Sequence, residues 1–210
     1  MNMPSLPAGL DHRPLIAILR GCPFRHAEEM AGAAIGAGLQ VIEITLDSER
    51  PLDQIAAISA AYPEVEVGAG TVRRGEDVAA AVSAGARFIV SPIVDRGIIE
   101  AAAELGIASL PGAATPSEIE AALRHGATAV KVFPVEQLGG PDYIKAVLSP
   151  LGNPPLIPTG GVSVESIPQY LGAGAIAVGL GGALFPTAAL KSADAATVAR
   201  LAKQAIEVLG

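Results

Sequence analysis

The chain has 210 residues, of which 50% are hydrophobic and 17% are charged, and its formal net charge is −7. This composition excludes a disordered chain, and the acidic balance argues against nucleic acid as a partner. No apolar run approaches the roughly 18 residues that a membrane-spanning helix needs, so we expect no membrane partner.

The N-terminus, the cysteine and the histidines bear on location and metal content. The first seven residues lack a basic region followed by an apolar core, so we expect no signal peptide. The single cysteine, Cys22, excludes an internal disulfide and suits a cytoplasmic protein. The three histidines, His12, His26 and His125, show no ligand spacing. We therefore expect no metal site.

Apolar segments alternate with segments of helical composition along the chain. Residues 1–14 contain three prolines, and we expect them to form a loose N-terminal leader. Eight short apolar runs have the character of buried strands: 15–19, 41–46, 65–67, 88–90, 107–110, 130–133, 156–158 and 175–178. Helices are expected between and after them: 25–37, 51–62, 75–84, 96–105, 115–126, 141–148, 164–172 and 194–209.

Glycines punctuate this alternation at a regular interval. Each of five glycines closes a helical segment one to four residues before an apolar run: Gly38, Gly85, Gly106, Gly126 and Gly174. Their spacing is about one or two units of 20–24 residues, which is typical of a β-α unit in a parallel sheet. Eight strands alternating with helices predict a single (β/α)8 TIM barrel domain over residues 1–210. A doubly wound open sheet is the alternative.

Lys131 in 127–134 and Glu43 in 41–46 are ionisable residues inside apolar segments. A buried ammonium or carboxylate group must find a partner, reach water or become neutral. A deprotonated amine attacks ketones, and burial lowers the pKa of an amine from about 10.4 toward neutrality. Burial raises the pKa of a glutamate, which suits it to proton transfer. The pattern predicts a catalytic lysine–glutamate pair, and a structural salt bridge is the alternative.

Further candidates follow the predicted strands, where the functional residues of such barrels lie: Arg20, Thr71, Pro92 and the pairs Gly160-Gly161 and Gly181-Gly182. An arginine can bind a carboxylate through paired hydrogen bonds, and a solvated loop arginine is the alternative. A threonine can bind a carboxylate or enol oxygen, or it can cap a helix. The glycine pairs offer backbone N–H groups to a phosphate, or they are plain turns.

The motifs that carry these candidates resemble one known family. In chain order they are LIAILRG at 15–21, VIEITL at 41–46, GAGT at 68–71, SP at 91–92, PG at 111–112, KVFP at 131–134 and TGGV at 159–162. Together they resemble the 2-keto-3-deoxy-6-phosphogluconate aldolase family, which also contains 6-phosphogalactonate and 4-hydroxy-2-oxoglutarate aldolases. The resemblance runs from about residue 15 to residue 187, nearly the whole chain.

The resemblance implies a class I aldolase on a (β/α)8 barrel, free of metal and cofactor and usually a homotrimer. Such an enzyme cleaves a 2-keto-3-deoxy-6-phospho-sugar acid to pyruvate and glyceraldehyde 3-phosphate. Lys131 would form the Schiff base and Glu43 would be the acid/base. The other implied roles are the pyruvate half for Thr71 and Pro92, packing beside the lysine for Phe133, and phosphate binding for Gly160, Gly161 and the strand-eight loop.

Two positions depart from the family pattern. Phosphogluconate members typically carry an arginine four residues after the catalytic glutamate, where this chain has Asp47. An arginine at the end of the first strand, here Arg20, is more similar to the phosphogalactonate branch. Family members also often have a serine in the strand-eight loop, where this chain has Gly182. The loss of that hydroxyl bears on the preference for phosphate.

Three other functions remain open from sequence. One is a 4-hydroxy-2-oxoglutarate aldolase without phosphate preference. Another is a barrel isomerase or epimerase of a sugar phosphate, which would use paired acid/base groups without a covalent amine. The third is a non-catalytic barrel that binds a sugar phosphate, and it would give no reason to bury Lys131.

Overall fold

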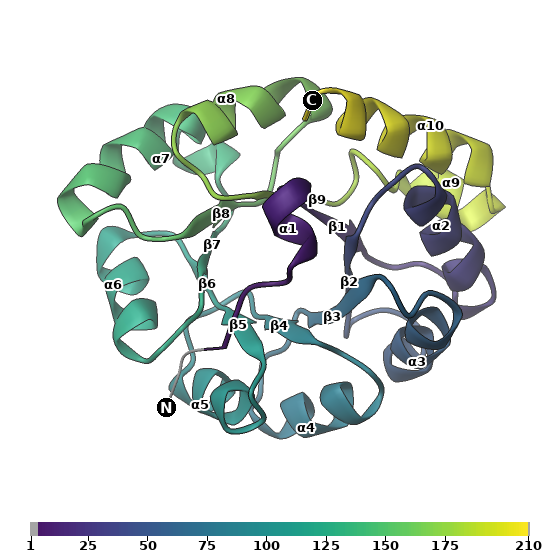
Figure 1. The fold of residues 1–210 in the computed structure, drawn as a ribbon, viewed down its shortest axis with the longest axis horizontal. Coiled ribbons are helices and arrows are strands. Elements are labelled where there is room, and N and C mark those ends of the chain that lie inside the picture. The colour runs from purple at the N-terminus through teal and green to yellow at the C-terminus, as the bar shows by residue number, and fades with distance from the viewer. Residues whose placement is uncertain (1–3, 210) are drawn as a thin grey trace.

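The computed structural model describes residues 4–209 as a ring of strands surrounded by helices (Figure 1). The strands are β1 Leu15–Leu19, β2 Val41–Thr45, β3 Glu66–Gly70, β4 Phe88–Val90, β5 Ala108–Leu110, β6 Gly112–Ala113, β7 Val130–Val132, β8 Leu156–Pro158 and β9 Val178–Leu180. The α-helices are α1 Gly9–His12, α2 Phe24–Gly36, α3 Pro51–Ala61, α4 Glu76–Ser83, α5 Arg96–Glu104, α6 Pro116–Arg124, α7 Gly140–Leu148, α8 Ile167–Gly172, α9 Thr187–Ser192 and α10 Ala195–Glu207. None of the described helices is long and apolar enough to cross a membrane.

The strands form two parallel sheets, one of six strands in the order β5-β4-β3-β2-β1-β9 and one of three in the order β6-β7-β8. Backbone hydrogen bonds join the sheets at both seams. At one seam the Lys131 N–H donates to the Pro111 carbonyl at 2.9 Å, where Pro111 alone separates β5 from β6. At the other seam the Ile176 N–H donates to the Leu156 carbonyl at 3.0 Å. The predicted parallel α/β fold is therefore confirmed.

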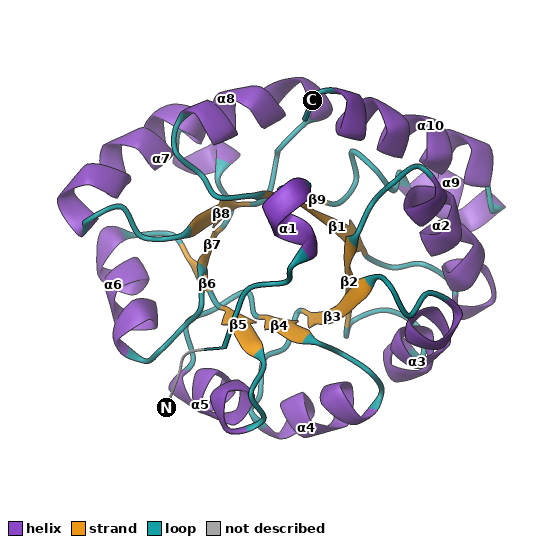
Figure 2. Cartoon of the chain, viewed as in Figure 1, coloured by secondary structure: helices purple, strands orange, loops and turns teal. Residues whose placement is uncertain are grey.

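Each strand is buried on both faces, because helices cover the outside of the ring (Figure 2) and side chains fill its inside. The inner layer of side chains is apolar near the N-terminal ends of the strands, where Ile16 and Phe88 lie. A Cβ at Gly68 would overlap the Phe88 ring, so this glycine makes room for the largest side chain of the layer. Polar buried residues such as Glu43 and Lys131 lie further along their strands.

The connections follow the chemistry expected from the sequence. Helix α6 begins with a capping box, in which the Thr115 side chain accepts from the Glu118 N–H and the Glu118 side chain accepts from the Thr115 N–H. Pro116 occupies its first turn, where a missing N–H has no cost. Gly126 follows the helix at φ +92°, a left-handed conformation that residues with a Cβ rarely adopt. The helix start and the helix end were both predicted.

The segment 1–14 differs from the expected loose leader. Within it α1 forms a short helix that lies in front of the ring in Figure 1. Leu10 is buried against the inner apolar layer, and the Gly9 N–H donates to the Glu66 carboxylate at 2.9 Å. The expectation was wrong for this part of the segment, because one buried leucine and one hydrogen bond attach it to the sheet. Residues 1–3 lie outside the described residues.

Two further details differ from the sequence prediction. The last strand begins at Val178 instead of residue 175, because the Ala175 N–H still bonds to the Tyr170 carbonyl at the end of α8. Helix α9 was not predicted.

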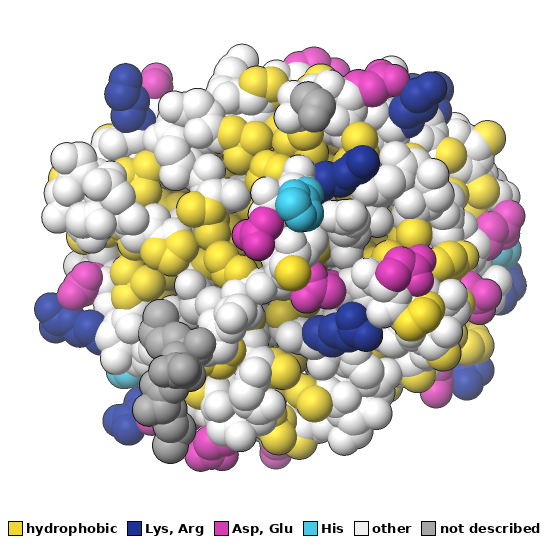
Figure 3. All heavy atoms as spheres, in the orientation of Figure 1, with side chains coloured by type: hydrophobic (Ala, Val, Ile, Leu, Met, Phe, Trp, Pro, Cys, Tyr) yellow, Lys and Arg dark blue, Asp and Glu magenta, His cyan; other side chains and the backbone are white. Residues whose placement is uncertain are grey.

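The face that carries α1 has acidic, basic and histidine side chains at its centre (Figure 3) and a pocket of about 440 Å³ lined in part by Asp11 and His12. Because α1 directly precedes β1, this face lies at the N-terminal ends of the strands.

Candidate active site

A cavity of about 520 Å³ opens at the C-terminal ends of the strands. All ten residues singled out from the sequence line it: Arg20, Glu43, Thr71, Pro92, Lys131, Phe133, Gly160, Gly161, Gly181 and Gly182. They come from the ends of both sheets and are brought together only by the fold. This is the end of a parallel α/β fold at which ligands generally bind.

Lys131 lies in the middle of β7 and is flanked in the sheet by Gly112 of β6 and Ile157 of β8. It is only 8% exposed. Its Nζ atom lies 5.3 Å from the centroid of the Phe133 ring, which stands two residues further along the chain and so on the same face. The amine is thus held against an aromatic face and inside the cavity.

Glu43 lies in the middle of β2 and is 2% exposed. Its partners in the neighbouring strands are Ile18 and Gly68. A Cβ at Gly70 would overlap the Glu43 carboxylate, so the glycine leaves the space that this side chain occupies. Burial raises the pKa of Glu43, and the nearby charges of Lys131 and Arg20 offset only part of that rise.

Glu43 and Lys131 do not form an ion pair. Among the residues that the structure describes, no salt bridge includes either side chain, and no hydrogen bond to the Glu43 carboxylate is found. The Lys131 charge nevertheless lies near enough to act on the pKa of Glu43. The alternative of a structural salt bridge between the two is therefore wrong.

Arg20 follows β1 directly and contacts residues that follow two neighbouring strands. Its Nε and Nη2 atoms donate to Asp47 Oδ2 at 3.1 and 2.9 Å, and Nη2 also donates to Thr71 Oγ1 at 3.1 Å. Thr71 has φ +57°, which is uncommon for a β-branched residue and marks a locally strained backbone. Arg20 thus has two hydrogen-bonding partners at the rim of the cavity, although its side chain is exposed.

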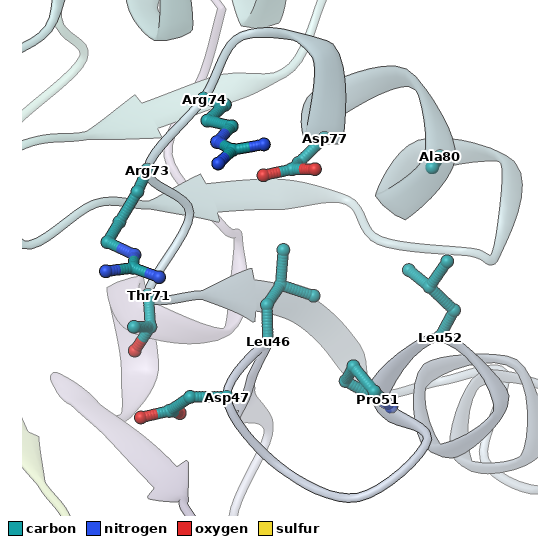
Figure 4. Close-up of a pocket in the computed structure, with 9 residues that line it drawn as sticks. All are labelled: Leu46, Asp47, Pro51, Leu52, Thr71, Arg73, Arg74, Asp77 and Ala80. Atoms are coloured by element: carbon teal, nitrogen blue, oxygen red, sulfur yellow. The ribbon is translucent and has the colours of Figure 1, made fainter.

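A second pocket, of about 280 Å³, adjoins the cavity on the other side of Thr71. Figure 4 shows the residues that line it, with the Arg74 guanidinium directed toward the Asp77 carboxylate. Asp47 lines this second pocket and not the cavity. The pair of Arg20 and Asp47 therefore lies between the two spaces.

The glycine pairs form the wall of the cavity beyond Lys131. Gly160 and Gly161 have φ +90° and +86°, so both require the freedom of glycine. A Cβ at Gly160 would lie 2.9 Å from the Phe133 ring. Around Gly182 a Cβ would meet nothing within 4 Å, so the wall is open at that point.

Seven lining residues were not predicted: Ile18, Thr45, Thr159, Val162, Ser163, Gly179 and Ala183. Strand alternation could have identified Thr45, because it stands two residues after Glu43 and faces the same side. Ser163 caps the 3-10 helix Val164–Ser166, a role that its position before a helical segment indicates. Thr159 is buried and has no such local signal.

Among residues 4–209 there is no group of three or more His, Cys, Asp or Glu side chains that could hold a metal ion. Cys22 is buried outside the cavity, and burial raises the pKa of its thiol to about 11. The cavity itself contains the Lys131 amine and the Glu43 carboxyl group.

Comparisons with known proteins agree with this geometry. The family model for KDPG and KHG aldolase matches residues 8–201. A 2-dehydro-3-deoxy-6-phosphogalactonate aldolase of Escherichia coli is 40% identical over 174 residues, 82% of this chain and 84% of the relative. A KHG/KDPG aldolase of the same organism is 34% identical over 194 residues, 92% of this chain and 91% of the relative.

Solved structures agree as well. The KDPG aldolase of Legionella pneumophila, with pyruvate captured as a covalent carbinolamine intermediate, superposes with a TM-score of 0.88 at 27% identity and covers 96% of this chain and 98% of that one. These matches place the protein among the aldolases, which are carbon–carbon lyases. The chain belongs to the KDPG and KHG aldolase family.

Proposed function

We propose that this protein cleaves a 2-keto-3-deoxy-6-phospho-sugar acid, of the gluconate or galactonate type, to pyruvate and glyceraldehyde 3-phosphate. The observation that carries the proposal is that Lys131 and Glu43 are both buried in one cavity without being paired to each other. A buried amine and a buried carboxyl group that are free of each other are available to a substrate. The covalent pyruvate adduct described for the Legionella relative supports the same chemistry.

In the proposed reaction the Lys131 amine attacks the C2 ketone carbon. The carbinolamine takes a proton from Glu43 and loses water, which gives an iminium ion that accepts electrons and a Glu43 carboxylate. Glu43 takes the proton of the C4 hydroxyl as the C3–C4 bond breaks, and the bonding electrons move to the iminium nitrogen to give an enamine. After the aldehyde leaves, Glu43 returns a proton to C3 and water hydrolyses the iminium to pyruvate and free Lys131. Proton transfers of this kind typically contribute about 10²–10⁴-fold each.

The remaining lining residues are assigned to the two ends of the substrate. Arg20, Thr71 and Pro92 lie at the rim on the β1 to β4 side and are proposed to hold the pyruvate half. Phe133 packs beside the lysine. The phosphate is proposed to bind the backbone N–H groups of Gly160-Gly161 and Gly181-Gly182, which line the opposite wall. The reaction needs no metal or other cofactor.

Borohydride trapping tests the covalent step. Incubation with pyruvate and borohydride should add a stable mass to Lys131 alone, as located by peptide mass spectrometry. The other lysines, Lys145, Lys191 and Lys203, lie in helices away from the cavity and serve as internal controls. An adduct on one of these, or none at all, would remove the Schiff-base mechanism and leave the isomerase alternative.

One observation favours a second function, a 4-hydroxy-2-oxoglutarate aldolase without phosphate preference. Gly182 supplies no hydroxyl donor, and a Cβ at Gly161 would overlap the Glu136 side chain, so a carboxylate lies beside the proposed phosphate site. Values of kcat/KM for 4-hydroxy-2-oxoglutarate and for the gluconate and galactonate substrates decide between the functions. We expect a phosphorylated substrate to be preferred, and equal values would make the glycine pairs plain turns.

We also propose that the two sheets form one closed eight-stranded barrel, with β5 and β6 counted as a single strand, and that the chain is one domain. The hydrogen bonds at both seams support closure over an open doubly wound sheet. The homotrimer and the cytoplasmic location expected from the sequence belong to the same proposal. Sedimentation equilibrium tests the trimer, and a monomer mass would exclude it.

A further inference from the structure

Asp47 stands where the resemblance leads one to expect an arginine, and the structure shows what it contacts. Its Oδ2 atom accepts hydrogen bonds from both Nε and Nη2 of Arg20, which follows a different strand. In Figure 4 the Asp47 carboxylate and the Thr71 hydroxyl point to the same side. Arg20, which the figure does not draw, donates to both through Nη2. Two residues from neighbouring strand ends therefore hold one guanidinium.

These contacts leave one part of the guanidinium free. Arg20 has five N–H donors, of which the Nε–H and the two on Nη2 serve Asp47 and Thr71. Nη1 has no hydrogen-bond partner within the described part of the chain. Because Arg20 lines the cavity and Asp47 does not, the free donors are the ones available to an anion in the cavity.

The same contacts limit the freedom of a mobile side chain. The Arg20 and Asp47 side chains are 55% and 48% exposed. An arginine that is this accessible would lose rotamer entropy on binding substrate if nothing had already ordered it. An acidic neighbour that orders it beforehand reduces this loss.

We propose that Asp47 is a positioning residue, which holds Arg20 so that its free N–H groups receive the carboxylate of the keto acid. This inference rests on the proposed function, since it deepens the role given there to Arg20. Asp47 does not line the cavity, so its effect on pyruvate binding is assigned to its contact with Arg20. If the negative charge of Asp47 merely neutralised Arg20, Asp47 would oppose binding of the carboxylate. Whether removal of Asp47 weakens or strengthens pyruvate binding therefore decides between the two roles.

The test measures pyruvate affinity by calorimetry and steady-state KM for Asp47→Asn and Asp47→Ala, each with and without Arg20→Ala. Asp47→Ala should weaken pyruvate binding and raise KM roughly 2- to 5-fold, the range of exposed ion pairs, with kcat nearly unchanged. Asp47→Asn keeps an acceptor oxygen and should have a smaller effect. With Arg20→Ala present, neither substitution at Asp47 should change the affinity further.

Glu100→Ala is the matched control, because Glu100 accepts from Arg96 Nε at 2.7 Å in an exposed ion pair outside the cavity, and its loss should leave KM unchanged. Tighter pyruvate binding by Asp47→Ala would show that Asp47 only neutralises Arg20. Equal losses with and without Arg20 would show that it acts independently, and no pyruvate binding by wild type would also overturn the inference. Pyruvate binding without cleavage of any phosphorylated keto acid would refute the proposed function. The role of Asp47 would then be decided by the pyruvate affinities of the variants alone.

Discussion

Gly70 offers a way to displace Glu43 without altering it. It stands at the end of β3, beside β2, and a Cβ there would overlap the oxygen, carboxyl carbon and Cγ of the Glu43 side chain. The backbone at Gly70 has no positive φ, so an alanine can adopt it without strain. Gly70→Ala therefore moves the carboxylate while the strand keeps its conformation.

The size of the effect follows from the overlap. The contact involves the inner atoms of the Glu43 side chain as well as its tip, so the whole carboxylate must shift by about an ångström or more. A misplacement of that size costs roughly 10²-fold in rate. We expect kcat of Gly70→Ala to fall by about that factor. The free energy of unfolding should change by much less than the activation free energy.

Steady-state kinetics and thermal unfolding check this expectation, with two comparisons. Gly36→Ala is the matched control, because a Cβ at Gly36 in α2 meets nothing within 4 Å and its activity should equal wild type. If Gly70→Ala acts through Glu43, it should cost little when Glu43→Ala is already present, since the overlap is then gone. Full activity in Gly70→Ala, or an equal loss in both backgrounds, would refute the reasoning.

Two further predictions concern the site, and a third concerns Cys22. Glu43→Gln should lower kcat by roughly 10²-fold or more. Because burial raises the pKa of Glu43 in the folded state, the ionised carboxyl group destabilises the fold increasingly as the pH rises above the pKa of the unfolded state. The Tm of the variant should therefore be at least that of wild type at pH 8, and a lower Tm would indicate a structural role for Glu43. Gly182→Ser adds a hydroxyl group in open space. It should lower KM for the phosphorylated substrate and leave KM for 4-hydroxy-2-oxoglutarate unchanged. Equal changes in KM for both substrates would count against a phosphate site at this position. Cys22, with a pKa of about 11, should resist iodoacetamide at pH 8 until the protein is denatured, and rapid labelling of the native protein would contradict its burial.

Most of the fold was predictable because its local signals are strong. Apolar runs buried on both faces and glycines that end helices mark the units of a parallel sheet. The errors fell where the signal was weak or the contact was distant. Residues 9–12 are packed because Leu10 contacts the inner apolar layer, and no local sequence pattern predicts that contact. The last strand shifted because the Ala175 N–H remains bonded to the preceding helix.

The site shows the same division. Lys131 and Glu43 were identifiable because a charge inside an apolar strand is costly and so carries information. The contact between Arg20 and Asp47 was not, because it joins exposed residues 27 positions apart that have no shared pattern. In the sequence Asp47 is only a departure from the family pattern, and the fold alone shows that it contacts the arginine.

The carboxyl groups of Glu118 and Glu43 differ in their contacts, and this difference bears on function. Glu118 accepts from the Ala114 and Thr115 N–H groups at 2.9 Å each, and these bonds lower its pKa. Glu43 is far more deeply buried, has no such donors among the described residues, and has a raised pKa. A buried carboxyl group that only stabilised the fold would be expected to have hydrogen-bond donors of the kind that Glu118 has, because hydrogen bonds offset the cost of burial. The fold instead keeps Glu43 unpartnered, facing the cavity that contains Lys131, so the cost of its burial is best explained by what a bound substrate requires.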